Sequence, residues 1–273
     1  MGVSLMKCKQ FAGLALVLCL GLSLAACNLK PAAPWPTLRE GGLREGGQLV
    51  QGSGKVVEKK LPLPDIEGGY ALRITGISLR GSYGGDVELV IDESLPREVV
   101  LTTDDNIAER IDISCDAGAG EIVIERQRMV FTPTKLTITV GAPVRALELN
   151  GAWNFTYDCP SVTACEVSIN GACNGKFTFG ALESLRVAVN GASNIALVGA
   201  AKRADLTING AADIKGFDLV AETARAVING AGDCEITATG TLDAEINGVG
   251  KVVYGGDPAV SKRVHGLGEV RAR

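Results

Sequence analysis

The sequence predicts an all-β fold, a parallel β-helix (β-solenoid) with 18–20 residues per coil in its C-terminal half. An Asn-Gly or Asn-Gly-Ala motif recurs at this spacing, with its asparagines at Asn150, Asn170, Asn190, Asn209, Asn229 and Asn247. Residues one and three before each Asn are apolar and alternate with mostly polar ones, which is typical of strands with one buried face. Identical residues at equivalent repeat positions indicate coils that stack in register.

The chain begins with the features of an export signal. Lys7 and Lys9 precede an uncharged apolar run, Phe11 to Ala26, that is short for a membrane-spanning helix. The run ends in Leu24-Ala25-Ala26-Cys27, which resembles the lipobox of bacterial lipoproteins. That resemblance implies that residues 1–26 are removed and that Cys27 receives lipid, which would tether the mature protein to a membrane. An ordinary signal peptide or an uncleaved anchor is the alternative.

The residues after Cys27 indicate the membrane to which the protein is sorted and the division of the chain into a tether and a folded domain. Asn28 replaces the aspartate that usually retains Gram-negative lipoproteins at the inner membrane, so the chain resembles the class sorted to the outer membrane. We therefore expect a lipid-anchored envelope protein. Residues 27–51 are rich in Pro and Gly and predict a flexible tether, and residues 52–273 predict the folded domain.

Charge and cysteine content narrow the function classes. Removing residues 1–26 removes two of 27 basic residues and none of 31 acidic ones, so the mature net charge is 25 − 31 = −6. A negative chain without a basic cluster argues against nucleic acid as a partner. Five cysteines remain beyond Cys27, namely Cys115, Cys159, Cys165, Cys173 and Cys234, so at least one is unpaired. Cys159 and Cys165 flank a Pro-containing loop, so a disulfide between them is one option that the sequence leaves open. Cys234 lies in an apolar column, and we expect it to be an inert buried thiol.

Each repeat is expected to supply a strand, a corner at Asn-Gly, a second strand and a return loop. The residue two after each Asn, such as Ala192, and the residue five after it, such as Ile195, are expected to point inward. The asparagines are expected to form a hydrogen-bonded ladder, and the following Gly to adopt φ > 0. A series of antiparallel hairpins is the alternative, because Asn-Gly between alternating apolar residues is also a hairpin signal.

The segments before Asn150 predict less regular β-structure, either further coils or an abutting β-layer. Their alternation is typical of strands. The expected strands are Tyr70–Leu79, Asp86–Ile91, Glu98–Thr103, Glu121–Arg126 and Lys135–Val140.

These motifs together resemble the auto-transporter adhesin head GIN domain family. The resemblance rests on Gly52-Ser53-Gly54-Lys55, on Asp104-Asp105-Asn106-Ile107, on the Asn-Gly-Ala repeats and on the closing Tyr254-Gly255-Gly256 with His265-Gly266-Leu267-Gly268. It covers about residues 52 to 273 and implies a right-handed β-helix and an adhesin-like role without a defined biochemical activity. His265 stands where Asn is usual, and Trp153 occupies an otherwise small column.

Two sets of residues are candidates for binding. Asp213 and Asp233 lie four residues after successive asparagines, and their oxygens, with that of Asn194, are the ligand type that calcium prefers. A solvated acidic corner explains the same pattern, and we predict no metal site. Trp153, together with Phe155 and Tyr157, suggests a platform for stacking sugars, although alternation equally places these rings in the core.

The predicted function is non-catalytic binding or adhesion to a glycan, a peptide or an envelope protein, without a cofactor. A structural, self-associating envelope component is the alternative, and the sequence leaves the oligomeric state open. A polysaccharide-active β-helix enzyme is a further alternative, but no Ser-His-Asp set, Cys-His pair or phosphate loop is visible and the chain has one histidine.

Overall fold

The computed structural model describes residues 48–75, 87–126 and 129–273, which belong to one compact unit. The predicted signal peptide, Cys27 and residues 28–47 of the predicted tether lie outside the described residues. Residues 48–51, the end of that predicted tether, instead form strand β1 (Gln48–Gln51), which pairs in parallel with β8 (Met129–Thr132). Within the described ranges, no helix has the length and apolar character needed to cross a bilayer.

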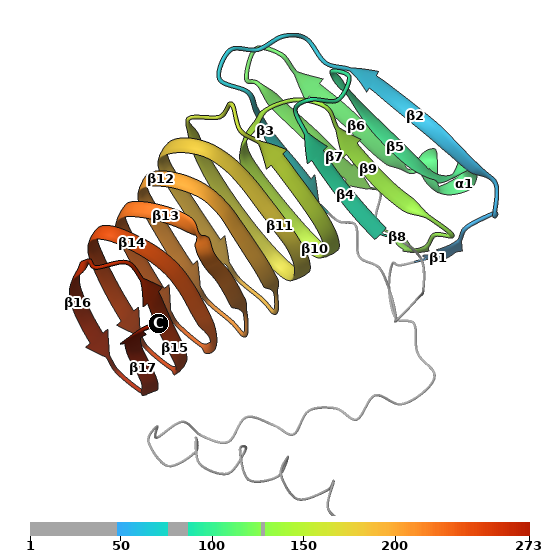
Figure 1. Ribbon diagram of the computed structural model, residues 1–273. Helices are drawn as coiled ribbons and strands as arrows, with labels where there is room; N and C mark the ends of the chain where they lie inside the picture. Colours follow the sequence, from blue (N-terminus) through green and yellow to red (C-terminus); the bar gives the residue numbers. More distant parts are fainter. Residues whose placement is uncertain (1–47, 76–86, 127–128) are drawn as a thin grey trace, which may run out of the picture. The chain divides into compact units, whose positions relative to one another are not determined.

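The chain forms a β-solenoid of about six turns, and its C-terminal coils stack in parallel (Figure 1). Asn150 pairs with Asn170 and Gly151 with Gly171, so equivalent residues of the repeat lie on one another. This register confirms the predicted fold class and excludes antiparallel hairpins at the Asn-Gly pairs. The strands are β10 (Val144–Cys159), β11 (Ala164–Val189), β12 (Asn194–Ile208), β13 (Asp213–Ile228), β14 (Ala231–Ile246), β15 (Val249–Gly255), β16 (Ala259–Val264) and β17 (Leu267–Ala272).

The N-terminal half combines partial coils with antiparallel strands. Some of its strands therefore form further coils and others form an abutting β-layer, the two arrangements that the sequence left open. Strands β3 (Tyr70–Thr75) and β4 (Val87–Asp92) lie parallel to β10 and continue the stack. The remaining elements are β2 (Val56–Pro62), β5 (Glu98–Asp104), α1 (Asp105–Ala108), β6 (Ile111–Asp116), β7 (Glu121–Arg126) and β9 (Leu136–Val140). Strands β7 and β9 pair in parallel with β3 and β4, whereas β5 runs antiparallel to β9 and β2, and β6 runs antiparallel to β7.

The alternation of buried and exposed residues continues through the Asn-Gly corner. Residues one and three before each Asn are buried, as predicted, and the residue five after it is buried in most coils. The prediction that the residue two after each Asn points inward is wrong, because Ala192 is exposed and Val249 and Leu267 are 54% and 79% exposed. Positions separated by two residues share a face of a strand, so this column lies on the same outer face as the asparagines.

The glycine after each Asn allows neighbouring coils to approach closely. The predicted left-handed conformation is wrong for most of these glycines: of the six in the Asn-Gly pairs, Gly151 alone has a positive φ, of 119°. A Cβ on Gly210 would lie 2.2 Å from the carbonyl oxygen of Gly191, and one on Gly230 equally close to that of Gly210. Glycine is therefore required by backbone contact between coils rather than by a turn conformation.

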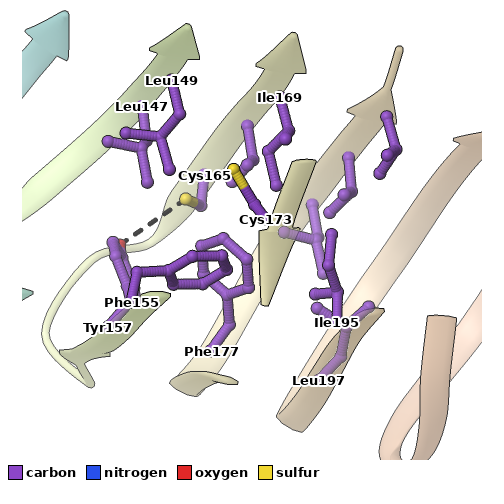
Figure 2. Close-up of a cluster of buried hydrophobic side chains, with 14 of the residues drawn as sticks. Leu147, Leu149, Phe155, Tyr157, Cys165, Ile169, Cys173, Phe177, Ile195 and Leu197 are labelled. Carbon is purple, nitrogen blue, oxygen red and sulfur yellow. Dashed lines mark hydrogen bonds between the residues drawn. The ribbon is translucent and has the colours of Figure 1, made fainter. Parts of the chain in front are cut away.

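The core is a continuous apolar column inside the coils, and aromatic rings lie in the part of it formed by β10 and β11 (Figure 2). The ring centroids of Phe155 and Phe177 are 4.8 Å apart, and those of Tyr157 and Phe177 are 5.2 Å apart. In the next coil, Ile195 and Leu197 take the equivalent positions. Tilted rings at these distances add about 0.5–1.5 kcal/mol per pair to the burial of their area.

Candidate functional site

The corner asparagines form a continuous amide ladder along the solenoid. Each side-chain nitrogen donates to the side-chain oxygen of the asparagine one coil earlier: Asn170 to Asn150 (3.0 Å), Asn190 to Asn170 (2.8 Å), Asn209 to Asn190 (2.8 Å), Asn229 to Asn209 (2.8 Å) and Asn247 to Asn229 (2.9 Å). Every interior amide therefore donates one ladder bond and accepts another. The ladder lies on the outer face, and its bonds hold the coils in register rather than form a pocket.

Asp213 and Asp233 cap backbone groups of the coils that follow them. The Oδ1 atom of Asp213 accepts a hydrogen bond from the Asp233 amide (3.1 Å), and Oδ1 of Asp233 accepts one from the Lys251 amide (2.9 Å). In the part of the chain that is described, no group of three or more His, Cys, Asp or Glu side chains is arranged to hold a metal ion. The geometry favours capping of the backbone over cation binding at this corner.

The aromatic candidates lie inside the solenoid. Trp153 is 2% exposed, and its indole nitrogen donates to the Asn150 carbonyl oxygen at 3.4 Å. Phe155 and Tyr157 are also buried, and the Tyr157 hydroxyl donates to the carbonyl oxygen of Val144. These three rings fill the core and are not exposed as a surface on which a sugar could stack.

All five cysteines in the described residues are free thiols, so the bridge considered between Cys159 and Cys165 is not formed. Burial raises the pKa of Cys159 and of Cys234 to about 12, and that of Cys165 and Cys173 to about 11. Cys165 lies 3.5 Å from the Tyr157 hydroxyl (Figure 2). Since the thiolate is the nucleophile, these thiols are inert structural side chains at neutral pH.

Two of the N-terminal motifs meet in space and form a clamp. The fully buried Asp104 accepts hydrogen bonds from the Gly54 amide (2.7 Å) and from the amide and hydroxyl of Thr134 (2.7 and 2.9 Å). The Ser53 hydroxyl donates to Asp105 at 2.6 Å, and the Ser53 amide donates to Asn106 at 3.1 Å. These polar residues tie the segment before β2 to the segment after β5, and sequence spacing alone does not reveal that they meet.

One face of the solenoid carries a groove that sequence reasoning missed. It consists of three adjoining depressions with volumes of about 220, 590 and 380 Å³. The first and second share Ala146 and Glu166, and the second and third share Arg203 and Asp205, so together they cross successive coils. Small side chains such as Ala164 and Ser184 line it together with Arg, Asp and Glu side chains. The available signal was the alternating charge of the residues four before each Asn from Asn170 to Asn247.

Comparisons with known proteins agree with this architecture. Residues 80–258 match the model of the family described as "Putative auto-transporter adhesin, head GIN domain". The chain belongs to this family. No curated protein matches the chain.

Solved structures share the fold of this head GIN domain protein. A "putative adhesin" from Bacteroides fragilis is 20% identical with a TM-score of 0.66, covering 82% of this chain and 100% of that chain. A "putative lipid binding protein" from Parabacteroides distasonis is 19% identical with a TM-score of 0.56, covering 83% and 100%. A "putative adhesin" from Parabacteroides merdae is 20% identical with a TM-score of 0.52, covering 82% and 99%. At these identities, the likeness concerns the fold alone.

Proposed function

We propose that this protein is a lipid-anchored component of the cell envelope that binds a partner, without catalysis, through the grooved face of its solenoid. The groove is the observation that carries the proposal: it runs across several coils, and charged and hydroxyl side chains line it. A rigid stack of strands presents such groups at a repeat of about 4.8 Å. This spacing suits an extended partner better than a small molecule. The family is described as a "putative auto-transporter adhesin" domain, and two of the three solved structures named above are called "putative adhesin" and the third a "putative lipid binding protein", all of which agree with a binding role.

The proposed anchor is lipid on Cys27, with residues 1–26 removed and the outer membrane as the destination. The support is the Leu24-Ala25-Ala26-Cys27 sequence followed by Asn28. Mass spectrometry of the protein purified from membranes tests this: the N-terminal peptide should begin at Cys27 and carry acyl chains. Cys27→Ser should abolish the modification and release the protein from the membrane fraction. An N-terminal peptide that begins elsewhere and is unmodified contradicts the anchor.

A glycan array, extended by envelope proteins and peptides, tests the binding role. Binding that is reduced by substitutions in the groove supports the proposal, and Trp153→Ala is unsuitable as a surface probe because that ring is buried. Turnover of a polysaccharide would overturn the non-catalytic role. Self-association measured by light scattering, without any ligand on the array, would favour the structural role instead.

A further inference from the structure

Charged side chains on the grooved face form ion pairs on both sides of a gap. The residues four before successive asparagines alternate in charge: Glu166, Arg186, Asp205, Arg225 and Asp243. Arg186 lies 3.9 Å from Glu166, while Arg225 lies 3.7 Å from Asp243. Asp205 stands in register between Arg186 and Arg225, yet forms no ion pair with any described residue.

The gap between these ion pairs contains two charged side chains, Asp205 and Arg203, without an ion pair to the described part of the chain. The Arg203 side chain is exposed and forms no ion pair or hydrogen bond within the described ranges. Arg203 and Asp205 line both the 590 Å³ and the 380 Å³ depressions, so the unpaired charges stand where the two depressions meet. Apart from Arg145, the other charged side chains that line the three depressions form ion pairs, as in Glu183 with Lys202 at 2.7 Å. The gap is therefore the part of the face with charged groups available to a ligand.

A β-bulge brings a third guanidinium to the same depression. Between Val144 and Ala146 the register against β3 shifts by one residue, and the extra residue is Arg145. The equivalent positions in later coils, such as Leu185, are buried, whereas the Arg145 side chain is exposed and lines the 590 Å³ depression. A bulge re-aims a side chain in this way. Three coil steps separate the Arg145 and Arg203 layers, a distance of about 14 Å along the groove.

We propose that this gap binds an acidic polysaccharide, with sugar carboxylates on Arg203 and Arg145 and sugar hydroxyls donating to Asp205. This inference rests on the proposed binding function and names its ligand class. Guanidinium groups hold carboxylates by charge-assisted hydrogen bonds, and a free carboxylate accepts hydroxyl protons. A neutral glycan is less suited because no residue lining the two depressions is aromatic. An added peptide strand is disfavoured because β11, β12 and β13 already pair on both sides.

Calorimetric titration of the full protein with galacturonic acid hexamer tests the proposal, with maltohexaose as the neutral probe and hexaglutamate as the acidic peptide probe. The galacturonate should bind, and its affinity should fall as salt rises. Arg203→Ala should weaken binding by about tenfold or more, since a charged hydrogen bond is lost. Arg145→Ala should act in the same direction. Lys215→Ala, which removes an exposed cation outside the groove, should leave the affinity unchanged.

The thermal midpoint of Arg203→Ala should be unchanged because Arg203 has no ion pair to lose, whereas Arg145→Ala removes a hydrogen bond from Nε to the Gly69 carbonyl oxygen (3.2 Å) and should lower the midpoint slightly. Absence of galacturonate binding at millimolar concentration overturns the proposal, as does an equal loss in Lys215→Ala. Hexaglutamate binding as tightly as galacturonate also overturns it, and assigns the gap to acidic peptides. Binding of another array glycan that is insensitive to Arg203→Ala would leave the proposed function standing while this inference fails.

Discussion

Substituting one interior asparagine tests whether the amide ladder holds the coils together. Asn190→Ala removes two hydrogen bonds of 2.8 Å, one donated to Asn170 and one accepted from Asn209. A net hydrogen bond contributes about 0.5–1.5 kcal/mol, and these lie in the lower part of that range because water reaches the amides left behind. We therefore expect a loss of about 1–2 kcal/mol, which lowers the thermal midpoint of a domain this size by about 2–8 °C.

The assay is thermal unfolding followed by circular dichroism, with guanidinium unfolding as the second measure. Asn154→Ala is the matched control, since the same side chain is removed from the same face but forms no hydrogen bond with the described residues. It should change stability by less than about 0.5 kcal/mol. Asn247→Ala also removes two hydrogen bonds, one to Asn229 in the ladder and one to Glu245, so it should destabilise about as much as Asn190→Ala. A loss in Asn190→Ala no greater than in Asn154→Ala refutes a stabilising ladder.

Three further predictions concern the core and the coil contacts. Gly210→Ala should destabilise the protein by about 1–3 kcal/mol in guanidinium unfolding, because the new Cβ would lie 2.2 Å from the carbonyl oxygen of Gly191. Gly118→Ala is the control: its Cβ would lie 3.3 Å from the nearest atom, so the loss of stability should be much smaller. Equal losses in the two variants would contradict a requirement for close approach of the coils. Trp153→Ala should cost about 3–5 kcal/mol in the same measurement while the folded fraction keeps its ligand affinity, and a selective loss of binding would argue for a surface role. Burial raises the folded-state pKa of Cys159 and Cys234 to about 12, above the unfolded-state pKa of about 8.5. The stability that these two protonated thiols contribute is therefore complete below about pH 8.5 and is lost as pH rises toward 12. A thermal midpoint that is constant from about pH 8 to 12, or rapid alkylation of either folded thiol at about pH 8, would contradict this.

The repeat made the solenoid predictable because in-register stacking imposes the same environment on each column. Asn150 and Asn170 must resemble one another when their amides meet, and their equivalents show the same constraint. The strands of the N-terminal half were predictable from alternation, but their partners were not. Whether β5 runs parallel or antiparallel to β9 depends on the path of the chain, which local periodicity does not encode.

Two errors at the Asn-Gly corner have one physical cause. The column between the Asn and the exposed Ala is a half-buried glycine. Because glycine has no side chain, the sequence shows no apolar residue at this position, and the exposed alanine beside it was mistaken for the core position. The glycine suggested a turn, yet what requires it is the neighbouring coil's carbonyl oxygen, 2.2 Å from where a Cβ would stand at Gly210. The local sequence indicates only the conformational preference of a glycine, whereas this constraint comes from contact between neighbouring coils.

The sequence by itself determined the parallel solenoid, the buried strand faces and the family, and it alone supplies the argument for a lipid anchor at Cys27. Only the tertiary structure decided which residues share the groove and which charges stay unpaired. Arg145 reaches that groove through a bulge. Among the described residues, Asp205 is unpaired because Arg186 and Arg225 pair with other carboxylates, and Arg203 is unpaired because its neighbours in register, Ser184 and Thr223, carry no charge. Such choices depend on side-chain directions and on residues several coils apart, so they exist only once the coils have stacked.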